Sequence, residues 1–294
     1  MQAPFITDNK NGWLRVEGCG DLSVFRTFDC GQCFRFDPAP DATFKTEVSG
    51  VAKGKSVRFA QSDEEGVLYV KGSEEDFSKL WHTYLSLDCD YNEINASIIN
   101  ALSGADGEHM KRAAESSAGI RILRQDSWEA LCSFIISQNN NIPRIKKIIA
   151  AMSEKYGERI DGGYAFPTAE ALLSAGEDAI FELRCGFRAK YIYDAAKKVA
   201  TGELILSDVR KCVSYADAEN MLLSIKGVGP KVAACTLLFG FERLDAFPVD
   251  VWIKKVIERR FKGGLDPKVF GKYAGIAQQY LFYYERYVGE REDN

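Results

Sequence analysis

The segment Ser224-Ile-Lys-Gly-Val-Gly-Pro-Lys-Val-Ala-Ala-Cys235, followed by Phe247-Pro-Val-Asp250, decides the fold of the C-terminal half of this chain. It predicts a helix, a Gly-Val-Gly hairpin and a second helix that begins at Pro230, where proline's missing N–H costs no hydrogen bond. Such a hairpin exposes consecutive backbone N–H groups at a helix N-terminus, an arrangement that suits a phosphate. We therefore expect Gly227 and Gly229 to form a phosphate-binding turn.

Lys231 falls in the first turn of the second predicted helix. The positive end of the helix disfavours a charged ammonium there, and burial would act in the same direction. A free amine next to a bound phosphodiester is a nucleophile that can attack a sugar carbon. A solvated side chain is the ordinary alternative for such a lysine. The hairpin before it and Asp250 after it favour the nucleophile.

Composition limits the class of protein. The chain has 294 residues, 46% of them hydrophobic and 27% charged, which is typical of a globular protein. Its net charge of −4 argues against broad electrostatic adhesion to nucleic acid. Basic residues nevertheless cluster at 144–147, 184–190 and 254–260, so binding through a few fixed contacts remains open. Solvated helix faces are the alternative interpretation of each cluster.

Targeting segments and cofactor motifs are not indicated. No run approaches the ~18 apolar residues of a membrane span, and residues 1–10 lack a signal-peptide core. We therefore expect a cytoplasmic, DNA-associated protein with no membrane partner. Cys30 and Cys33 have metal-like spacing but no second pair, and several other cysteines, such as Cys132, lie in apolar runs. We expect no metal bound by side chains, no iron–sulfur cluster and no other cofactor, and we leave open whether the hairpin carbonyls hold a monovalent cation.

The pattern along the chain predicts an α+β fold. Residues 1 to about 72 have the short alternating runs and turn residues of an antiparallel β-sheet, and from Glu74 onward the period is helical. Asp126-Ser-Trp-Glu129 has capping-box spacing before an apolar helix that runs through Ile136. We expect a β domain with flanking helices at 1–118 and a helical domain at 119–294. Its further helices are expected at 142–156, 168–175, 189–201, 214–225, 230–239, 251–261 and 268–288.

Four further segments resemble those of the 8-oxoguanine DNA glycosylase/AP lyase family, within the helix-hairpin-helix glycosylases that carry a downstream Gly/Pro…Asp element. Together with the hairpin, these segments match the family in the same order along nearly the whole chain. The segments are Asp29-Cys-Gly-Gln-Cys-Phe-Arg-Phe36, Arg124-Gln-Asp126, Ser137-Gln-Asn-Asn-Asn-Ile-Pro-Arg-Ile145 and Gly275-Ile-Ala-Gln-Gln-Tyr-Leu-Phe282.

The resemblance implies a catalytic pair. Lys231 would attack C1′ of an extruded nucleotide, expel the base and leave an imine, from which β-elimination cuts the strand. Asp250 would stabilise positive charge on the sugar as the glycosidic bond breaks. A plain helix N-cap also explains Asp250, and the two roles are compatible.

The resemblance also implies a base pocket. Gln278 and Phe282 are spaced i, i+4, so a helix places the amide and the ring on one face, although core packing also explains Phe282. Cys235, four residues after Lys231, would cover the opposite face of the base. The carbonyl of Gly31 would accept the N7–H of 8-oxoguanine and repel N7 of guanine, a difference on the order of 2–3 kcal/mol. An ordinary turn glycine is the alternative.

Contacts to the remaining DNA complete what the resemblance implies. Asn139, Arg144 and Arg188 would contact the orphaned cytosine, and Phe187 would be the wedge that holds the helix open. The family commonly has tyrosine at the Phe187 position and histidine at the Trp252 position, so this chain keeps the rings without those polar groups. Asparagine tolerates a left-handed helix end, which explains one of Asn139, Asn140 and Asn141 better than three.

The function expected from these residues is excision of 8-oxoguanine opposite cytosine in double-stranded DNA, by a monomer. A glycosylase for another damaged purine, such as an alkylated one, is the enzymatic alternative, although its monofunctional members generally do not have the lysine. A non-catalytic protein that uses the hairpin only to bind DNA is the alternative from a different class.

Overall fold

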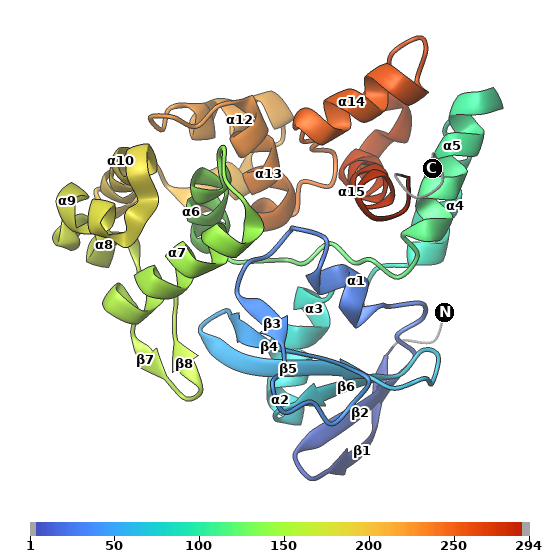
Figure 1. Cartoon of the computed structure of the whole chain (residues 1–294), viewed down its shortest axis with the longest axis horizontal. Coiled ribbons are helices and arrows are strands. Elements are labelled where there is room, and N and C mark those ends of the chain that lie inside the picture. Colours follow the sequence, from blue (N-terminus) through green and yellow to red (C-terminus); the bar gives the residue numbers. More distant parts are fainter. Residues whose placement is uncertain (1–3, 290–294) are drawn as a thin grey trace.

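The computed structural model describes residues 4–289, so residues 1–3 of the predicted β domain and residues 290–294 of the predicted helical domain lie outside the described residues. The N-terminal part is a six-stranded antiparallel sheet with the strand order β1-β2-β6-β5-β4-β3, as Figure 1 shows. This confirms the predicted sheet. Its strands are β1 (Phe5–Lys10), β2 (Trp13–Glu17), β3 (Phe36–Pro38), β4 (Thr46–Ala52), β5 (Lys55–Gln61) and β6 (Leu68–Lys71).

One face of the sheet carries the core of this part of the molecule. Successive residues of a strand point to opposite faces, and those of β5 and β6 that point inward are buried. Phe59 on β5 is the centre of this core, with its ring centroid 5.4 Å from that of Phe28 and 5.6 Å from that of Trp81. Aromatic pairs at these separations add to the free energy gained by burial.

The expectation that residues up to about 72 are all extended was wrong for one segment. Residues Val24–Phe28 form a short helix, α1, whose N-cap Ser23 accepts a hydrogen bond from the Arg26 N–H at 3.3 Å. A helix of little more than one turn is too short to show a helical period in the sequence. Its position matters, because α1 leads directly into the turn that carries Gly31.

The change to helix at Glu74 is confirmed, and so is the predicted helix 142–156, which coincides with α7. The helices up to α7 are α2 (Glu74–Asp76), the π-helical turn η1 (Phe77–Trp81), α3 (His82–Tyr84), α4 (Tyr91–Ile99), α5 (Gly104–Ser116), α6 (Ser127–Ser137) and α7 (Ile142–Tyr156). A small hairpin that the sequence pattern did not indicate, β7 (Arg159–Ile160) with β8 (Gly163–Tyr164), follows α7.

The remaining predicted helices up to residue 261 are confirmed to within two residues at either end. These elements are α8 (Ala169–Ala175), α9 (Glu177–Ile180), η2 (Phe181–Cys185), η3 (Gly186–Arg188), α10 (Ala189–Ala200), α11 (Leu206–Lys211), α12 (Tyr215–Leu223), α13 (Pro230–Phe241) and α14 (Val251–Arg260). Of these, α9, α11 and the short turns η2 and η3 were not expected.

The single helix expected at 268–288 was wrong. This segment consists of a 3₁₀ turn η4 (Pro267–Tyr273), the helix α15 (Ala274–Tyr284) and a π-helical turn η5 (Glu285–Gly289). The backbone of Gly271 has φ +54°, which breaks the helical path within η4, before α15 begins. Glycine adopts this conformation at little cost, so the break depends on a residue whose role the pattern did not reveal.

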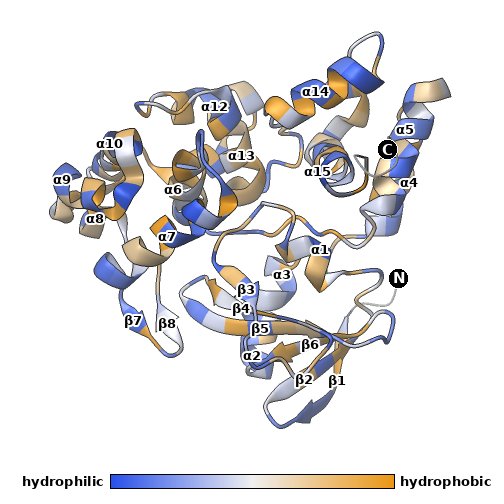
Figure 2. Cartoon of the chain, viewed as in Figure 1, coloured by the Kyte–Doolittle hydropathy of each residue, from blue (hydrophilic) through white to orange (hydrophobic). Residues whose placement is uncertain are grey.

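Helix α13 lies at the centre of the helical body. All its residues from Val232 to Phe241 are buried, as expected for a helix that is apolar on every side. Figure 2 shows its apolar colouring, in contrast to the alternating colours of α14 at the surface. Helices α4 and α5 belong to this second core and pack with α15 rather than on the sheet. The proposed domain boundary at residue 118 stays a prediction. Within residues 4–289 no helix has the length and apolar character needed to span a membrane.

Candidate DNA-binding and base-recognition site

The hairpin between α12 and α13 has the predicted form. Pro230 is the first residue of α13, and Gly229 is its N-cap, with no side chain bonded to the free N–H groups of the first turn. Gly227 has φ +77°, and a Cβ at this position would overlap the ring of Tyr191 on α10. Asp194 fixes the start of the turn, because its carboxylate accepts the Lys226 N–H at 2.8 Å. Both glycines are therefore placed where an anion can approach the backbone.

Lys231, Cys235 and Asp250 lie together at the N-terminal ends of α13 and α14. Burial raises the pKa of the Cys235 thiol, the ammonium of Lys231 within hydrogen-bonding reach lowers it, and the carboxylate of Asp250 raises it. The Nζ of Lys231 is also 5.7 Å from the centroid of the Phe134 ring. Asp250 is the N-cap of α14 and accepts the Ile253 N–H at 2.8 Å, which confirms its structural role.

Gly31 and Phe282 face each other from opposite ends of the chain. A Cβ built on Gly31 would be 3.7 Å from Cε1 of Phe282 and 3.9 Å from Cδ1 of Ile142. Gly31 has φ +77°, so its backbone conformation favours glycine, whereas these distances are those of ordinary van der Waals contact. Phe282 itself is only partly buried. Its ring packs against the hydrophobic core of the helical body, and it also lies beside Gly31.

Gln278 lies one turn before Phe282 on α15 and is 5% exposed. Within residues 4–289 its amide makes no hydrogen bond. Its amide atoms are not among the fully buried polar atoms that lack a partner, so they reach the surface and can bind the polar groups of a ligand. Gln278 thus has the properties expected of a base-reading residue.

Of the three consecutive asparagines, one has the left-handed conformation, as expected, and the other two have different local roles. Asn139 has φ +47°, the left-handed conformation at the end of α6. The side chain of Asn140 donates to the Ile136 carbonyl at 3.0 Å, and Asn141 caps α7 by accepting the Arg144 N–H at 3.0 Å. Asn139 is exposed, so its side chain is available for contact with DNA.

The guanidinium of Arg188 is less accessible to DNA than the side chain of Asn139. It is 2% exposed, and its guanidinium donates to the carbonyls of Gln138, Asn139 and Cys185. Burial, and then the neighbouring charge of Arg144, lowers the pKa of Arg188. A contact with an orphaned base would therefore compete with these carbonyls. Arg144 is exposed and donates one hydrogen bond, to the Arg184 carbonyl at 3.0 Å.

Phe187 and Trp252 are the two rings of the predicted DNA-binding surface. Phe187 is 47% exposed on η3, with the Arg188 guanidinium 4.4 Å from its ring centroid. Its ring also meets that of Tyr191 edge to face at 5.9 Å, so the predicted wedge and the hairpin share one support. Trp252 is half-buried in the first turn of α14, with Lys255 Nζ 5.3 Å from its ring.

Comparison with known proteins agrees with this geometry. Residues 19–131 match the model of the 8-oxoguanine DNA glycosylase N-terminal domain, and residues 132–267 match that of the HhH-GPD superfamily base excision DNA repair proteins. The 8-oxoguanine glycosylase/lyase of Clostridium acetobutylicum, solved with double-stranded DNA containing cytosine opposite 8-oxoguanine, is 35% identical, with a TM-score of 0.85. That match covers 97% of this chain and 99% of the other. The chain belongs to the 8-oxoguanine DNA glycosylase family.

Two other relatives support membership of the family. The structure of MBOgg1 with a low-affinity DNA ligand is 38% identical, with a TM-score of 0.87, and the match covers 98% of this chain and 100% of that one. The N-glycosylase/DNA lyase of Saccharomyces cerevisiae is 38% identical over 162 residues, which are 50% of this chain. The match spans 43% of the yeast protein, less than half of its length.

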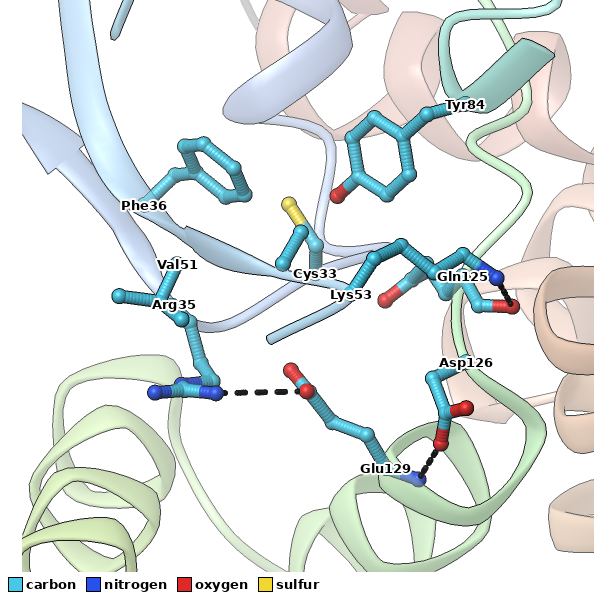
Figure 3. Close-up of a pocket in the computed structure, with 10 residues that line it drawn as sticks. Cys33, Arg35, Phe36, Val51, Lys53, Tyr84, Gln125, Asp126 and Glu129 are labelled. Carbon is cyan, nitrogen blue, oxygen red and sulfur yellow. Dashed lines mark hydrogen bonds and ion pairs between the residues drawn. The ribbon is translucent and has the colours of Figure 1, made fainter. Parts of the chain in front are cut away.

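A pocket away from the predicted base pocket also occurs in this member of the 8-oxoguanine DNA glycosylase family. It lies between the sheet and α6, where Arg35 and Glu129 form an ion pair of 3.3 Å and Asp126 caps the helix (Figure 3). Burial raises the pKa of Glu129 to about 7 despite the charge of Arg35. The pocket contains none of the predicted site residues. Among residues 4–289 no group of three or more His, Cys, Asp or Glu side chains could hold a metal ion.

Sequence reasoning missed the residues that support the family's predicted site. Gln279 donates to the Cys30 carbonyl at 2.9 Å, and Tyr287 donates to the Asp29 carbonyl at 2.6 Å, both in the turn that carries Gly31. Tyr191, below Gly227, was also missed. The contacts that give these residues their roles join distant segments, so the local sequence held no signal for them.

Proposed function

We propose that this chain excises 8-oxoguanine from double-stranded DNA, opposite cytosine, and then cuts the strand at the resulting site. The observation that carries the proposal is that the turn of Gly31 faces the ring of Phe282, with the amide of Gln278 one helical turn away. A flipped base can stack on such a ring while an amide binds its edge. Relatives named N-glycosylase/DNA lyase support the same reaction.

The proposed chemistry begins at Lys231. Its unprotonated amine attacks C1′, the bond from C1′ to N9 breaks, and the base leaves with the bonding electrons and takes up a proton. The nitrogen then forms an imine with C1′ as the sugar ring opens. Loss of a C2′ proton breaks the C3′–O bond, and its electrons leave with the 3′ phosphate. The carboxylate of Asp250 stabilises the positive charge that develops on the sugar.

Cys235 supports the proposal as a neutral wall of the pocket. Because burial raises the pKa of this thiol, it stays protonated at neutral pH. A neutral, polarisable sulfur can contact the face of a base without adding a charge beside Lys231. A thiolate would instead form a strong pair with the ammonium and hold back the nucleophile.

Reductive trapping tests the proposal. The protein is incubated with a duplex that carries one 8-oxoguanine opposite cytosine, and borohydride is added to reduce any imine. We expect a covalent protein–DNA band that Lys231→Gln abolishes and that Lys226→Gln, a lysine in the same hairpin, retains. Tight binding without a band would contradict the proposal. Release of free base would then indicate a monofunctional glycosylase, and its absence a DNA-binding protein.

A further inference from the structure

The turn that carries Gly31 is held by side chains at almost every carbonyl. The Asp29 carbonyl accepts from Tyr287 at 2.6 Å, and the Cys30 carbonyl accepts from Nε2 of Gln279 at 2.9 Å. The Gln32 carbonyl accepts from Nε2 of Gln125 at 2.7 Å. Among residues 4–289 no group donates to the carbonyl of Gly31. The one acceptor left free in this row is the one expected to meet the lesion.

The side chains that hold this turn come from α15, from η5 and from the segment just before α6, which contains Gln125. Gln279 lies on α15, next to the predicted base-reading residue Gln278, and Tyr287 lies on η5. Gln32 also anchors the turn from within, because its side chain donates to the Arg121 carbonyl at 2.8 Å and accepts the Leu123 N–H at 2.9 Å. Both partners of the Gln279–Cys30 hydrogen bond are buried, so water does not readily replace it.

We propose that Gln279 is a specificity-determining positioning residue. By holding the Cys30 carbonyl, it fixes the orientation of the next peptide group and aims the carbonyl of Gly31 at N7–H of a flipped 8-oxoguanine. It also ties this acceptor to α15, so that Gly31, Gln278 and Phe282 move as one unit. The inference rests on the proposed function and assigns a residue that neither contacts the base nor takes part in the chemistry.

The test compares two reactions of the same protein. Excision of 8-oxoguanine opposite cytosine requires base reading, whereas incision at a pre-formed abasic site requires only Lys231 and DNA binding. Gln279→Met keeps the size of the side chain and removes the donor. We expect about a tenfold loss of single-turnover excision, with abasic-site incision within about twofold of wild type. The matched control is Gln61→Met, since Gln61 also donates to a backbone carbonyl, that of Leu22 at 2.6 Å, in the sheet domain. This control should leave the ratio of the two rates unchanged.

A second variant separates positioning from folding. Gln279→Glu places a carboxylate against the Cys30 carbonyl, which repels it, whereas the protonated acid can donate the missing hydrogen bond. The excision rate divided by the abasic-site rate should therefore fall at neutral pH and recover as the pH is lowered. Equal losses in both reactions, or no loss in either variant, would overturn the role of Gln279. Wild-type protein that incises abasic sites but leaves 8-oxoguanine intact would instead overturn the proposed substrate.

Discussion

A Cβ on Gly31 would be 3.7 Å from Cε1 of Phe282, in van der Waals contact with it, so Gly31 lies directly beside the ring. In Gly31→Ala the methyl group would enter the space proposed for the base. A residue at φ +77° also adds about 1–2 kcal/mol of backbone strain. We expect excision of 8-oxoguanine to fall at least about tenfold while affinity for undamaged duplex changes little. The control is Gly54→Ala, at φ +72° with open space around it. Equal losses of excision and affinity would contradict the pocket.

Two substitutions of Asp250 separate its structural role as a helix cap from its proposed chemical role as a carboxylate. Asparagine caps helices about as well as aspartate, so Asp250→Asn should unfold with a free energy within about 0.5 kcal/mol of wild type. It should nevertheless lose about 100-fold or more in excision rate, since the charge is gone. Asp250→Ala should lose about 1 kcal/mol of stability as well. The measurements are denaturant unfolding and single-turnover excision. Wild-type rates in Asp250→Asn would show that the carboxylate charge is not needed.

Gly227→Ala tests the support of the hairpin. The added methyl group would overlap the ring of Tyr191, so the hairpin and α10 must separate. We expect at least about tenfold weaker binding to duplex DNA, measured by fluorescence anisotropy, together with a lower melting temperature. Gly202→Ala has the same φ of +77° but open space, and should show only the backbone strain. The same affinity in both variants would argue against a role for the Tyr191 contact.

Replacement of Arg188 should affect folding as well as recognition. Arg188→Ala removes the donors to three carbonyls, which predicts a loss of about 1–3 kcal/mol in the free energy of unfolding. Arg144→Ala should leave stability nearly unchanged, because Arg144 is exposed. If either arginine reads the orphaned base, its alanine variant flattens the preference among the four opposing bases. A preserved ranking in a folded variant removes that residue from the role.

The raised pKa of Glu129 predicts that the stability of the fold depends on pH. Its pKa is about 7 in the folded protein, against 4.5 for the unperturbed carboxyl group. Between these values the folded state holds a proton that the unfolded state releases, so stability falls as the pH rises from about 4.5 to about 7. The total change is about 3 kcal/mol at most. Glu129→Gln should flatten this slope in urea unfolding, whereas the exposed Glu154→Gln should not. An identical slope in both variants would show that Glu129 does not titrate in this range.

Local signals in the sequence predicted the parts of the fold that depend on neighbouring residues. The hairpin, the proline at the start of α13 and the cap at Asp126 all follow from groups within a few positions of one another. The bounds of the last helix were not predicted correctly. At its start, the sequence pattern did not reveal the break at Gly271, and at its end the aromatic run Tyr280–Tyr284 continues the helical pattern up to the π-helical turn η5.

In the candidate site, too, some residues were indicated by the sequence and others were not. Lys231, Asp250 and the pair Gln278 and Phe282 were predicted from spacing and resemblance. The roles of Gln279 and Tyr287 depend on hydrogen bonds to Cys30 and Asp29 that span most of the chain. No local period encodes such pairings. The burial of Arg188 was equally hidden, since the three carbonyls that receive its guanidinium belong to the ends of two other helical segments.

The meeting of Gly31 with α15 also sets an order of events during protein synthesis. A nascent chain that has emerged only as far as α14 already has the hairpin and Lys231. It still lacks α15, which carries Gln278 and Phe282, the residues proposed to hold a flipped base. The residues proposed to recognise the lesion are thus synthesised after the proposed nucleophile. Because nearly all of α15 is buried, a protease that removed it would take away part of the helical core together with Gln278 and Phe282.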